Sequence, residues 1–512
     1  MSSSGIVLLL HSHMPYVRRN GDWPVGEEWL LEAWSESYLP IWRIIEEMTA
    51  GKLPGKLALT MTPVLAEQLS DGYLEERLDG YLKNKIDQTL QEMERLAGMG
   101  DGPRRRLASF FGDFYRGLLR DFEERFRGRM MKVLAEGMDA GAVEVMASAA
   151  THGHLPTLDS DRSRTAQIEI GLESYRRCFG RDPRGFWLPE CAYTPELDEV
   201  LAAFSPPLSY VVLDFYAMES PPGEAMTWRP QRLGSTPLLA LIRDEVAHDL
   251  VWTMWGYPAG GDYREYNKRD YDGHGFQYWR ITTGLTPLKE KDIYNPEKAV
   301  ALAGADAGDF AAKLKKRVED LSSSVPAQEN DAPTLVLAAY DTELMGHWWR
   351  EGPIWLREVL QLLAGETVLP ADIAEACRNR DVPAISPMMT AWSVDGSFSV
   401  WINEGTEDIW ERTHRTEEDF AKRVLSTSKS EEERRALIQA ARELLLVEAS
   451  DWSFLISRNT AADYARERFA SHLARYREAT AMFERGEIDA DLLSEMEDID
   501  NIFPWLDLRY WK

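Results

Sequence analysis

Cysteine is scarce in this chain, and the few that occur show no paired spacing. The 512 residues include three cysteines, Cys178, Cys191 and Cys377. An odd, widely spaced set does not fit a disulfide framework and is typical of reduced thiols in a cytosolic protein. We therefore expect a cytoplasmic protein.

Long apolar runs and positive charge are also in short supply. The apolar run near the N-terminus, Gly5–Leu10, is too short for a signal sequence and lacks a basic flank. No run approaches the length of a membrane span. Lys and Arg number 58 against 85 Asp and Glu, which gives a formal net charge of −27. Such a field repels phosphate backbones and anionic membrane surfaces. We expect no nucleic-acid or membrane partner, whereas a neutral sugar polymer stays compatible.

The apolar segments that are present predict an α/β barrel. Hydrophobic residues make up 44% of the chain, enough for a large core. Five short apolar runs each stop at polar or aromatic residues, as parallel strands do when they carry a site at their carboxyl ends. These runs are Gly5–Leu10, Val143–Ala147, Gly185–Leu188, Tyr210–Leu213 and Thr334–Ala339.

Two regions depart from this pattern and read as helical. Residues 71–130 are charged and helix-periodic, with a break at Gly100–Pro103, and predict a helical insertion. Residues 397–512 predict a C-terminal all-helical domain that contributes to the substrate cleft. The predicted barrel domain is therefore 1–396, interrupted by the insertion.

Two carboxyl groups follow predicted strands in strongly apolar surroundings. Glu190 comes after Gly185–Leu188 and is flanked by aromatics, and Asp341 comes after Thr334–Ala339. Either one alone could be structural, held by an Arg or a helix N-terminus. A pair at two strand ends favours glycoside hydrolysis, which needs two carboxyl groups flanking the scissile bond.

Histidines form two His-x-His pairs at strand ends. His11 and His13 follow the first run, and His152 and His154 follow Val143–Ala147. Alternate residues of an extended chain share a face, so each pair can present two rings to one site. The pairs could bind sugar hydroxyls or a divalent metal, as in metal-dependent amidohydrolases, or they could be buried structural histidines.

Five segments, taken in order, resemble motifs of glycoside hydrolase family 57, with its 1,4-α-glucan branching enzymes as the most similar subgroup. The resemblance extends from residue 6 to Trp505. The segments are His11–Pro15, Gly153–Pro156, Trp187–Tyr193, Tyr340–Leu344 and Ala391–Asp408.

The resemblance implies a (β/α)7-type barrel and a retaining mechanism on an α-glucan such as amylose or a glycogen-like polymer. Glu190 would be the nucleophile and Asp341 the general acid/base. His11, His13 and His154 would line the subsite of the cleaved glucose without a metal, and no cofactor is implied. Further substrate contacts implied by the family pattern are Trp23, Arg264, Gly275, Trp279, Trp401, Trp410 and Asp451.

The chain departs from the branching subgroup at two places. Thr460 stands where those members tend to have Gln. The segment Glu219–Arg243, which corresponds to their Tyr-tipped mobile loop, contains no Tyr, and Trp228 and Met226 are the nearest substitutes. A lid of this kind keeps water from the glycosyl-enzyme. The alternatives to branching are therefore an α-amylase-like hydrolase or a 4-α-glucanotransferase, and, from other classes, a metal-dependent amidohydrolase or a non-catalytic glucan-binding protein.

Overall fold

A computed structural model describes residues 5–22, 25–218, 227–270, 275–324, 333–426 and 430–512. Its strands are β1 (Gly5–Ser12), β2 (Leu57–Met61), β3 (Val143–Ser148), β4 (Gly185–Trp187), β5 (Tyr210–Leu213), β6 (Gln231–Leu233), β7 (Leu239–Ile242), β8 (Leu335–Asp341) and β9 (Ala384–Ile385). Within these ranges they form one nine-stranded sheet in the order β8-β1-β2-β3-β4-β5-β7-β6-β9.

The sheet from β8 to β7 is parallel and curled. Every neighbouring pair in this part is parallel, whereas β6 runs antiparallel to β7. Just after β7, the amide of Asp244 donates to the carbonyl of Leu337 in β8 at 2.9 Å, so the sheet turns back toward its first strand. The predicted (β/α)7-type barrel is confirmed.

Alternation along the strands decides which side chains face the barrel interior. All eight residues of β1 are buried, as expected for a parallel strand covered on both faces. Val7 and Leu9 pack in the interior with Leu337, and residues of the other parity pack against the surrounding helices. His11 and Asp341, paired in register, continue the interior parity at the carboxyl ends of β1 and β8.

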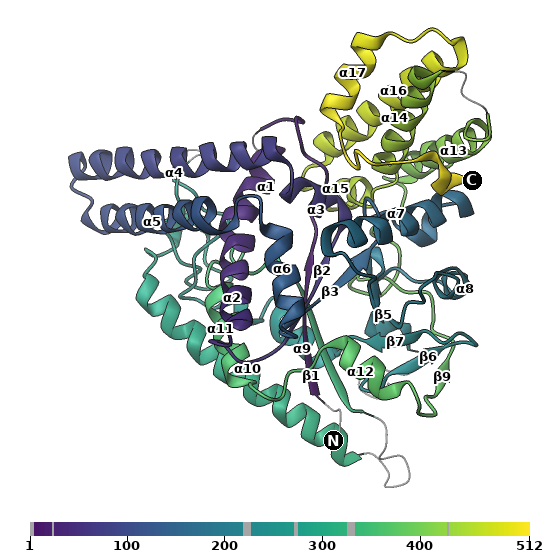
Figure 1. Ribbon diagram of the computed structural model, residues 1–512. Coiled ribbons are helices and arrows are strands. Elements are labelled where there is room, and N and C mark those ends of the chain that lie inside the picture. Colours follow the sequence, from purple (N-terminus) through teal and green to yellow (C-terminus); the bar gives the residue numbers. More distant parts are fainter. Residues whose placement is uncertain (1–4, 23–24, 219–226, 271–274, 325–332, 427–429) are drawn as a thin grey trace.

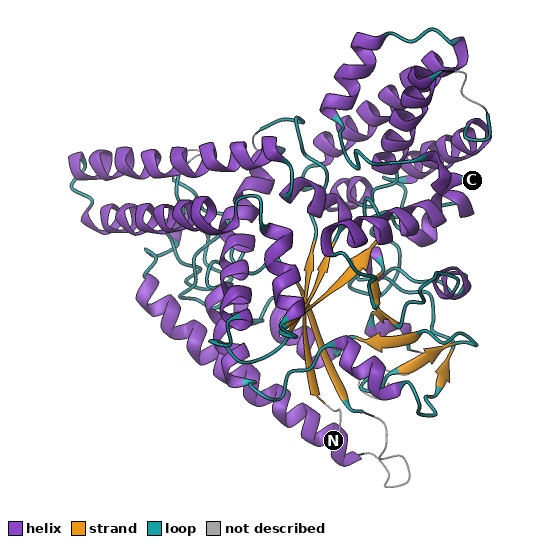
Figure 2. Ribbon diagram, in the orientation of Figure 1, coloured by secondary structure: helices purple, strands orange, loops and turns teal. Residues whose placement is uncertain are grey.

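Helices surround the sheet, as Figures 1 and 2 show. They are α1 (Glu27–Ala33), the π-helical turn η1 (Trp34–Tyr38), α2 (Leu39–Thr49), α3 (Pro63–Leu69), α6 (Met130–Asp139), α7 (Asp161–Phe179), α8 (Leu197–Ala202), α9 (Glu245–Trp252), α10 (Pro296–Ser324), α11 (Gly352–Leu362) and α12 (Pro370–Cys377).

The predicted helical insertion is a hairpin that projects from the barrel (Figure 1). It consists of α4 (Gly72–Gly98) and α5 (Gly102–Asp121), followed by the π-helical turn η2 (Phe122–Phe126). Asp71 caps α4 by accepting from the amide of Leu74 at 2.9 Å, and Asp101 caps α5 by accepting from that of Arg104 at 3.0 Å. Gly100, at φ +70°, makes the turn between them.

The C-terminal helices lie over the carboxyl ends of the strands (Figure 1). They are α13 (Glu407–Arg423), α14 (Glu431–Val447), α15 (Asp451–Arg458), α16 (Ala462–Arg485) and α17 (Ala490–Ile499). Their core is continuous with helices around the barrel, because Leu437 and Leu444 belong to one cluster with Val64 of α3 and Ile170 of α7. The predicted boundary at residue 397 remains a prediction, since the two regions share packing.

In the described part of the chain, no helix combines the length and the apolar character that crossing a membrane requires.

Candidate active site

Glu190 lies in a sharp turn directly after β4. The turn is a 3₁₀ helix, η4 (Pro189–Cys191), in which Glu190 has φ +61° and ψ +20°. Left-handed backbone is uncommon for a residue with a side chain and recurs at functional sites. The amide of Trp392 donates to the carbonyl of Glu190 and helps to hold this conformation.

Asp341 is the last residue of β8, and the two predicted catalytic carboxyl groups lie close enough to interact. Burial raises the pKa of Glu190 to about 7, and the charge of Asp341 contributes to the increase. Burial also raises the pKa of Asp341 to about 7, against the opposing influence of Arg243. Two carboxyl groups that both titrate near neutral pH can divide the acid and base roles between them.

A third carboxyl group, Glu343, lies beside this pair. Burial and the nearby Asp341 raise the pKa of Glu343 to about 8. One of its oxygens accepts from the Tyr38 hydroxyl and from the backbone amide of His13 at 3.2 Å. Glu343 thus connects the end of β8 to the segment that carries His13.

The histidines stack beside the carboxyl groups. The ring centroids of His13 and His152 are 3.8 Å apart, and those of His11 and Trp187 are 4.8 Å apart. His11 Nδ1 lies 2.6 Å from the Thr60 hydroxyl. His13 Nδ1 lies 3.1 Å from Thr62, and its Nε2 lies 2.9 Å from Asp451 Oδ1.

These rings differ in how readily they are protonated. Burial lowers the pKa of His13, but the charge and hydrogen bond of Asp451 outweigh burial and raise it above its usual value. Burial and the neighbouring histidines lower the pKa of His11 and His152 well below the usual value. His13 is therefore the ring of this group that is most readily protonated, and its charge acts on Glu190.

His13 is a poor candidate for a metal ligand. Both ring nitrogens of His13 are already hydrogen-bonded to protein groups, which leaves no free lone pair for a cation. Among the described residues, three potential ligands with converging donor atoms occur at Glu443, His472 and Asp500. That group lies in the C-terminal helices, away from the histidine pairs.

The start of α15 completes the site from the helical region. Asp451 binds His13, and the Ser450 hydroxyl lies 2.9 Å from Glu190 Oε1. Ser450 was not among the predicted residues, and its signal in the sequence was only its position next to Asp451. Glu343 could have been found from its spacing, because it lies two residues after Asp341.

Comparison with known proteins agrees with this geometry. Residues 7–251 match glycosyl hydrolase family 57, and residues 412–511 match the C-terminal region of 1,4-alpha-glucan branching enzymes. A 1,4-alpha-glucan branching enzyme of Thermococcus kodakarensis is 32% identical over 534 residues, which cover 97% of this chain and 77% of that protein. The chain belongs to glycosyl hydrolase family 57.

Solved structures of the family share the whole fold. The branching enzyme of Pyrococcus horikoshii superimposes with a TM-score of 0.90 at 32% identity, covering 99% of this chain and 97% of that one. The α-amylase AmyC of Thermotoga maritima gives a TM-score of 0.85 at 26% identity, covering 100% of this chain and 99% of that one. The same fold therefore occurs in a solved structure described as a branching enzyme and in one described as an α-amylase.

Two of the predicted aromatic contacts are buried in this family 57 structure. His154 packs between Trp401, at 5.1 Å between centroids, and Phe398, at 4.9 Å. Trp401 is fully buried, Trp410 is 6% exposed, and the Trp410 indole donates to the Trp401 carbonyl at 2.7 Å. Both rings are therefore held in place by protein contacts, and their contact with a glucose remains a prediction.

Arg264, Gly275 and Trp279 lie in the segment between α9 and α10. Arg264 is buried and binds Glu36 at 2.9 Å, and it also donates to the carbonyl of His347. The amide of Gly275 donates to the carbonyl of Asp270 at 2.7 Å. Trp279 is partly exposed, with the Lys268 ammonium 4.2 Å from its ring. Arg264 thus holds the loop after Asp341 through the carbonyl of His347.

The structure does not bring Trp228 to the catalytic centre. Its carbonyl accepts from the amide of Leu335, the first residue of β8, whereas Asp341 is the last. Six residues of strand separate them by about 20 Å at 3.3 Å per residue. Trp228 as a lid residue was therefore a wrong expectation. Thr460 is exposed beyond the end of α15, and Trp23 and residues 219–226 lie outside the described residues.

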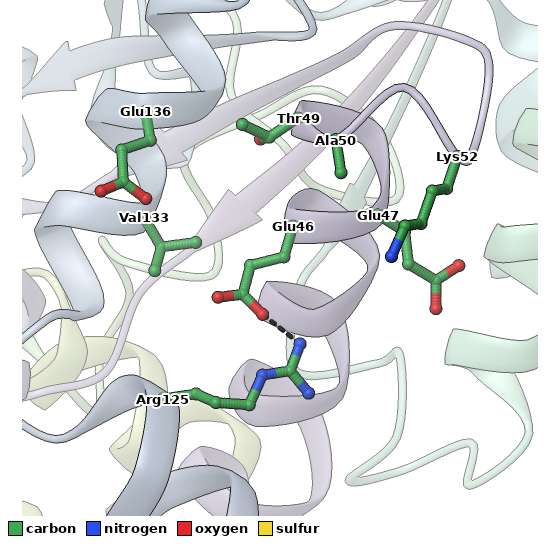
Figure 3. Close-up of a pocket in the computed structure, with 8 residues that line it drawn as sticks. All are labelled: Glu46, Glu47, Thr49, Ala50, Lys52, Arg125, Val133 and Glu136. Carbon is green, nitrogen blue, oxygen red and sulfur yellow. Dashed lines mark hydrogen bonds and ion pairs between the residues drawn. The ribbon is translucent and has the colours of Figure 1, made fainter.

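A surface pocket of about 360 Å³ lies at the other end of the barrel (Figure 3). It is lined by Glu46, Glu47, Thr49, Ala50, Lys52, Arg125, Val133 and Glu136. Most of these side chains come from the C-terminal end of α2 and the residues just after it, which precede β2, and Val133 and Glu136 come from the middle of α6, while Arg125 binds Glu46. The pocket is thus separate from the carboxyl ends where Glu190 and Asp341 lie.

Proposed function

We propose that this chain is a 1,4-α-glucan branching enzyme in which Glu190 is the nucleophile and Asp341 the general acid/base. The observation that carries the proposal is the pair of carboxyl groups with raised pKa at the ends of β4 and β8. They occur in a chain that superimposes on a family 57 branching enzyme with a TM-score of 0.90.

The first half-reaction cleaves the donor chain. A carboxylate oxygen of Glu190 forms a bond to the anomeric carbon, and the α-1,4 bond to the departing glucan oxygen breaks. Asp341 gives its proton to that oxygen, so the leaving chain departs as a neutral alcohol. The product is a glycosyl-enzyme of inverted configuration.

The second half-reaction transfers the chain. Asp341, now a carboxylate, takes the proton of an acceptor 6-hydroxyl as that oxygen attacks the anomeric carbon. The bond to Glu190 breaks, and Glu190 leaves as a carboxylate. A second inversion restores the α configuration and yields an α-1,6 branch.

The electrostatics of the site support this division of roles. His13 and the hydrogen bond from Ser450 both lower the pKa of Glu190 and so favour its carboxylate. A pKa of about 7 keeps a proton on Asp341 through mildly acidic conditions. The active protonation state therefore reaches its largest fraction near neutral pH.

We further propose that the substrate is a storage α-glucan such as glycogen or amylose, processed in the cytoplasm. The net charge of −27 permits a neutral polymer, and the three cysteines are free thiols. His11, His13 and Asp451 lie beside the carboxyl groups and would contact the cleaved glucose. Trp279, as the partly exposed aromatic of the predicted set, would contact a more distant ring by stacking.

An α-amylase-like hydrolase is the second candidate, because AmyC superimposes with a TM-score of 0.85 and Glu219–Arg243 contains no Tyr. Incubation with amylose, with reducing ends and α-1,6 linkages counted separately, distinguishes the two. We expect α-1,6 linkages together with appreciable new reducing ends. Reducing ends without α-1,6 linkages would make the protein a hydrolase.

A further inference from the structure

Ser450 connects the C-terminal helices to the nucleophile. It is fully buried just before α15, and its hydroxyl lies 2.9 Å from Glu190 Oε1 and 3.0 Å from His152 Nδ1. Its backbone amide donates to the carbonyl of His152 at 3.1 Å. One residue of the helical region therefore contacts two barrel residues, through two polar atoms of its own and three of theirs.

The protonation states of Glu190 and His152 fix which atoms donate and which accept in these hydrogen bonds. An ionised Glu190 can only accept, so the Ser450 hydroxyl donates to Glu190 and its oxygen accepts from His152 Nδ1. Burial and the neighbouring histidines keep His152 neutral, so a proton on Nδ1 leaves Nε2 without one. His152 Nε2 has no hydrogen-bond partner among the described residues, which agrees with this tautomer.

The two barrel residues in this chain of hydrogen bonds both have left-handed backbone. His152 has φ +59° and Glu190 has φ +61°. Such conformations persist where surrounding contacts hold them. Ser450 supplies two contacts to His152 and one to Glu190, which holds both residues from the same direction.

The geometry points to Ser450 as a positioning residue for the nucleophile. We propose that its hydroxyl, oriented by His152, fixes Glu190 Oε1 and leaves Oε2 as the oxygen that bonds to the anomeric carbon. This inference rests on the proposed function, because it requires Glu190 to be the nucleophile. It adds a role for the helical region in the chemical step, beyond any role in substrate binding.

The donor affects the two half-reactions differently. Glu190 is a carboxylate before attack and again as it leaves, and a hydroxyl donor stabilises that charge more than it stabilises the ester. When the glycosyl-enzyme breaks down, the bond from Oε2 to the anomeric carbon breaks and its electron pair returns to the carboxylate. Loss of the donor should therefore slow this breakdown and make the covalent intermediate accumulate.

The test compares Ser450→Ala with Ser453→Ala, a change of the same kind on the next turn. Ser453 is also buried, but its hydroxyl donates to the carbonyl of Ser450 and does not contact Glu190. On amylose we expect kcat to fall about 10- to 100-fold in Ser450→Ala, the scale of one hydrogen bond to a charged group. Ser453→Ala should change kcat less than about threefold.

Two further readouts separate positioning from loss of structure. In Ser450→Ala the acid limb of the pH–kcat/KM profile, which reports the free enzyme, should move to higher pH, because Glu190 loses a donor while His13, His152, Asp341 and Asp451 remain. Intact-mass analysis after acid quench should show a larger fraction of glycosyl-enzyme than in wild type. Ser450→Thr, which keeps the hydroxyl, should show the wild-type acid limb and the wild-type fraction of glycosyl-enzyme. If Ser450→Ala folds poorly, the near-isosteric Ser450→Cys is measured in its place.

Glu190→Gln, measured in parallel, separates failure of this inference from failure of the proposed function. If Glu190→Gln is inactive while Ser450→Ala and Ser450→Cys keep the wild-type kcat, acid limb and intermediate level, the role of Ser450 is overturned and the nucleophile stands. If Glu190→Gln keeps wild-type activity, the nucleophile assignment itself is overturned.

Discussion

Two buried groups of carboxyls and histidines occur in this molecule, and they are compensated differently. In the C-terminal helices, Glu443, His472 and Asp500 are fully buried, and Arg475 Nε lies 2.6 Å from Asp500. In the catalytic centre, Glu190 keeps 19% of its side chain exposed and has Ser450 as its hydroxyl donor. The first group is sealed and paired with arginine, whereas the second is open to a substrate.

The histidines show the same contrast. His472 Nε2 accepts from Arg468 at 2.9 Å, so its Nδ1 carries the proton and donates to Glu443 at 2.7 Å. Both nitrogens are then occupied, which also leaves no lone pair for a metal. In the catalytic centre His152 Nε2 lacks a partner among the described residues. A buried histidine with both ring nitrogens bonded to protein stabilises the fold, whereas one with an unused ring nitrogen is available to a ligand.

The largest expected effect removes the reactive carboxyl group. Glu190→Gln should reduce kcat on amylose by about 10⁴-fold or more, because the amide cannot form the glycosyl-enzyme. Circular dichroism should show an unchanged fold. The exposed Glu196→Gln, a few residues on, serves as the control and should keep wild-type turnover. Near-normal cleavage by Glu190→Gln would show that Glu190 is not the nucleophile, and the catalytic difference between the two groups would be lost.

The next effect concerns stability in the helical region. Arg475→Met leaves Glu443 and Asp500 buried without this cation, which should lower the free energy of unfolding by about 3–5 kcal/mol. Turnover per folded molecule should stay at the wild-type value. The exposed Arg477→Met on the same helix should change stability by less than about 0.5 kcal/mol. Denaturant titration of both variants measures the difference, and equal values would contradict a paired, structural role.

A smaller effect is the pH dependence that Glu190 gives to the free energy of unfolding. The folded-state pKa of Glu190, about 7, exceeds its unfolded value of 4.5, so ionisation destabilises the fold as pH rises from 4.5 through 7. Glu190→Gln should therefore be more stable than wild type at pH 8, by at most about 3 kcal/mol at 1.36 kcal/mol per pKa unit. At pH 4 the difference should vanish. Thermal melts at both pH values check this, and a gain confined to pH 4 would reverse the sign we assign.

A further prediction probes the imidazolium beside Glu190. Asp451→Asn removes the charge that raises the pKa of His13, so His13 should become neutral near pH 7. We expect kcat to fall about tenfold and the acid limb of the pH profile to move upward, as Glu190 loses a neighbouring cation. The exposed Asp463→Asn provides the control. An unchanged pH profile in Asp451→Asn would show that His13 is neutral in the working enzyme.

The smallest expected effect is that of a chelator. Since His13 already bonds through both nitrogens, exhaustive dialysis against EDTA should leave amylose cleavage and the melting temperature unchanged. Elemental analysis of the purified protein should find no stoichiometric zinc. Activity that is lost with EDTA and restored by zinc would favour the amidohydrolase alternative.

The sequence predicted the barrel and its two carboxyls better than the surroundings of those carboxyls. β1 and β8 were visible because they are continuous apolar runs that end in polar residues. β2 and β7 were missed, because LALTM and LALI are short and equally compatible with a buried helix segment. Periodicity located the helical hairpin and its break at Gly100, because charge and spacing persist over many turns.

Contacts between distant segments were the part that could not be predicted. Nothing in the spacing of Ser450 indicates Glu190, 260 residues earlier, and the contact exists only because α15 lies over the end of β4. The family pattern pointed to Trp401 as a sugar contact, but burial depends on how Phe398 and His154 pack around it. Trp228 was placed as a lid residue by its position in the chain, whereas its backbone pairs with the beginning of β8.

The alternation along β8 limits how this protein can change during evolution. Leu335, Leu337, Ala339 and Asp341 share the inward face, so loss of one residue before Asp341 would turn the carboxyl outward and bring Tyr340 in. Such a shortened strand would stay apolar and could still pair with β1, yet it would carry no acid at the site. Insertions and deletions in β8 that keep the acid at the site must therefore add or remove residues in pairs. Homologues that have lost activity but kept the fold should include some with a one-residue insertion or deletion in this strand.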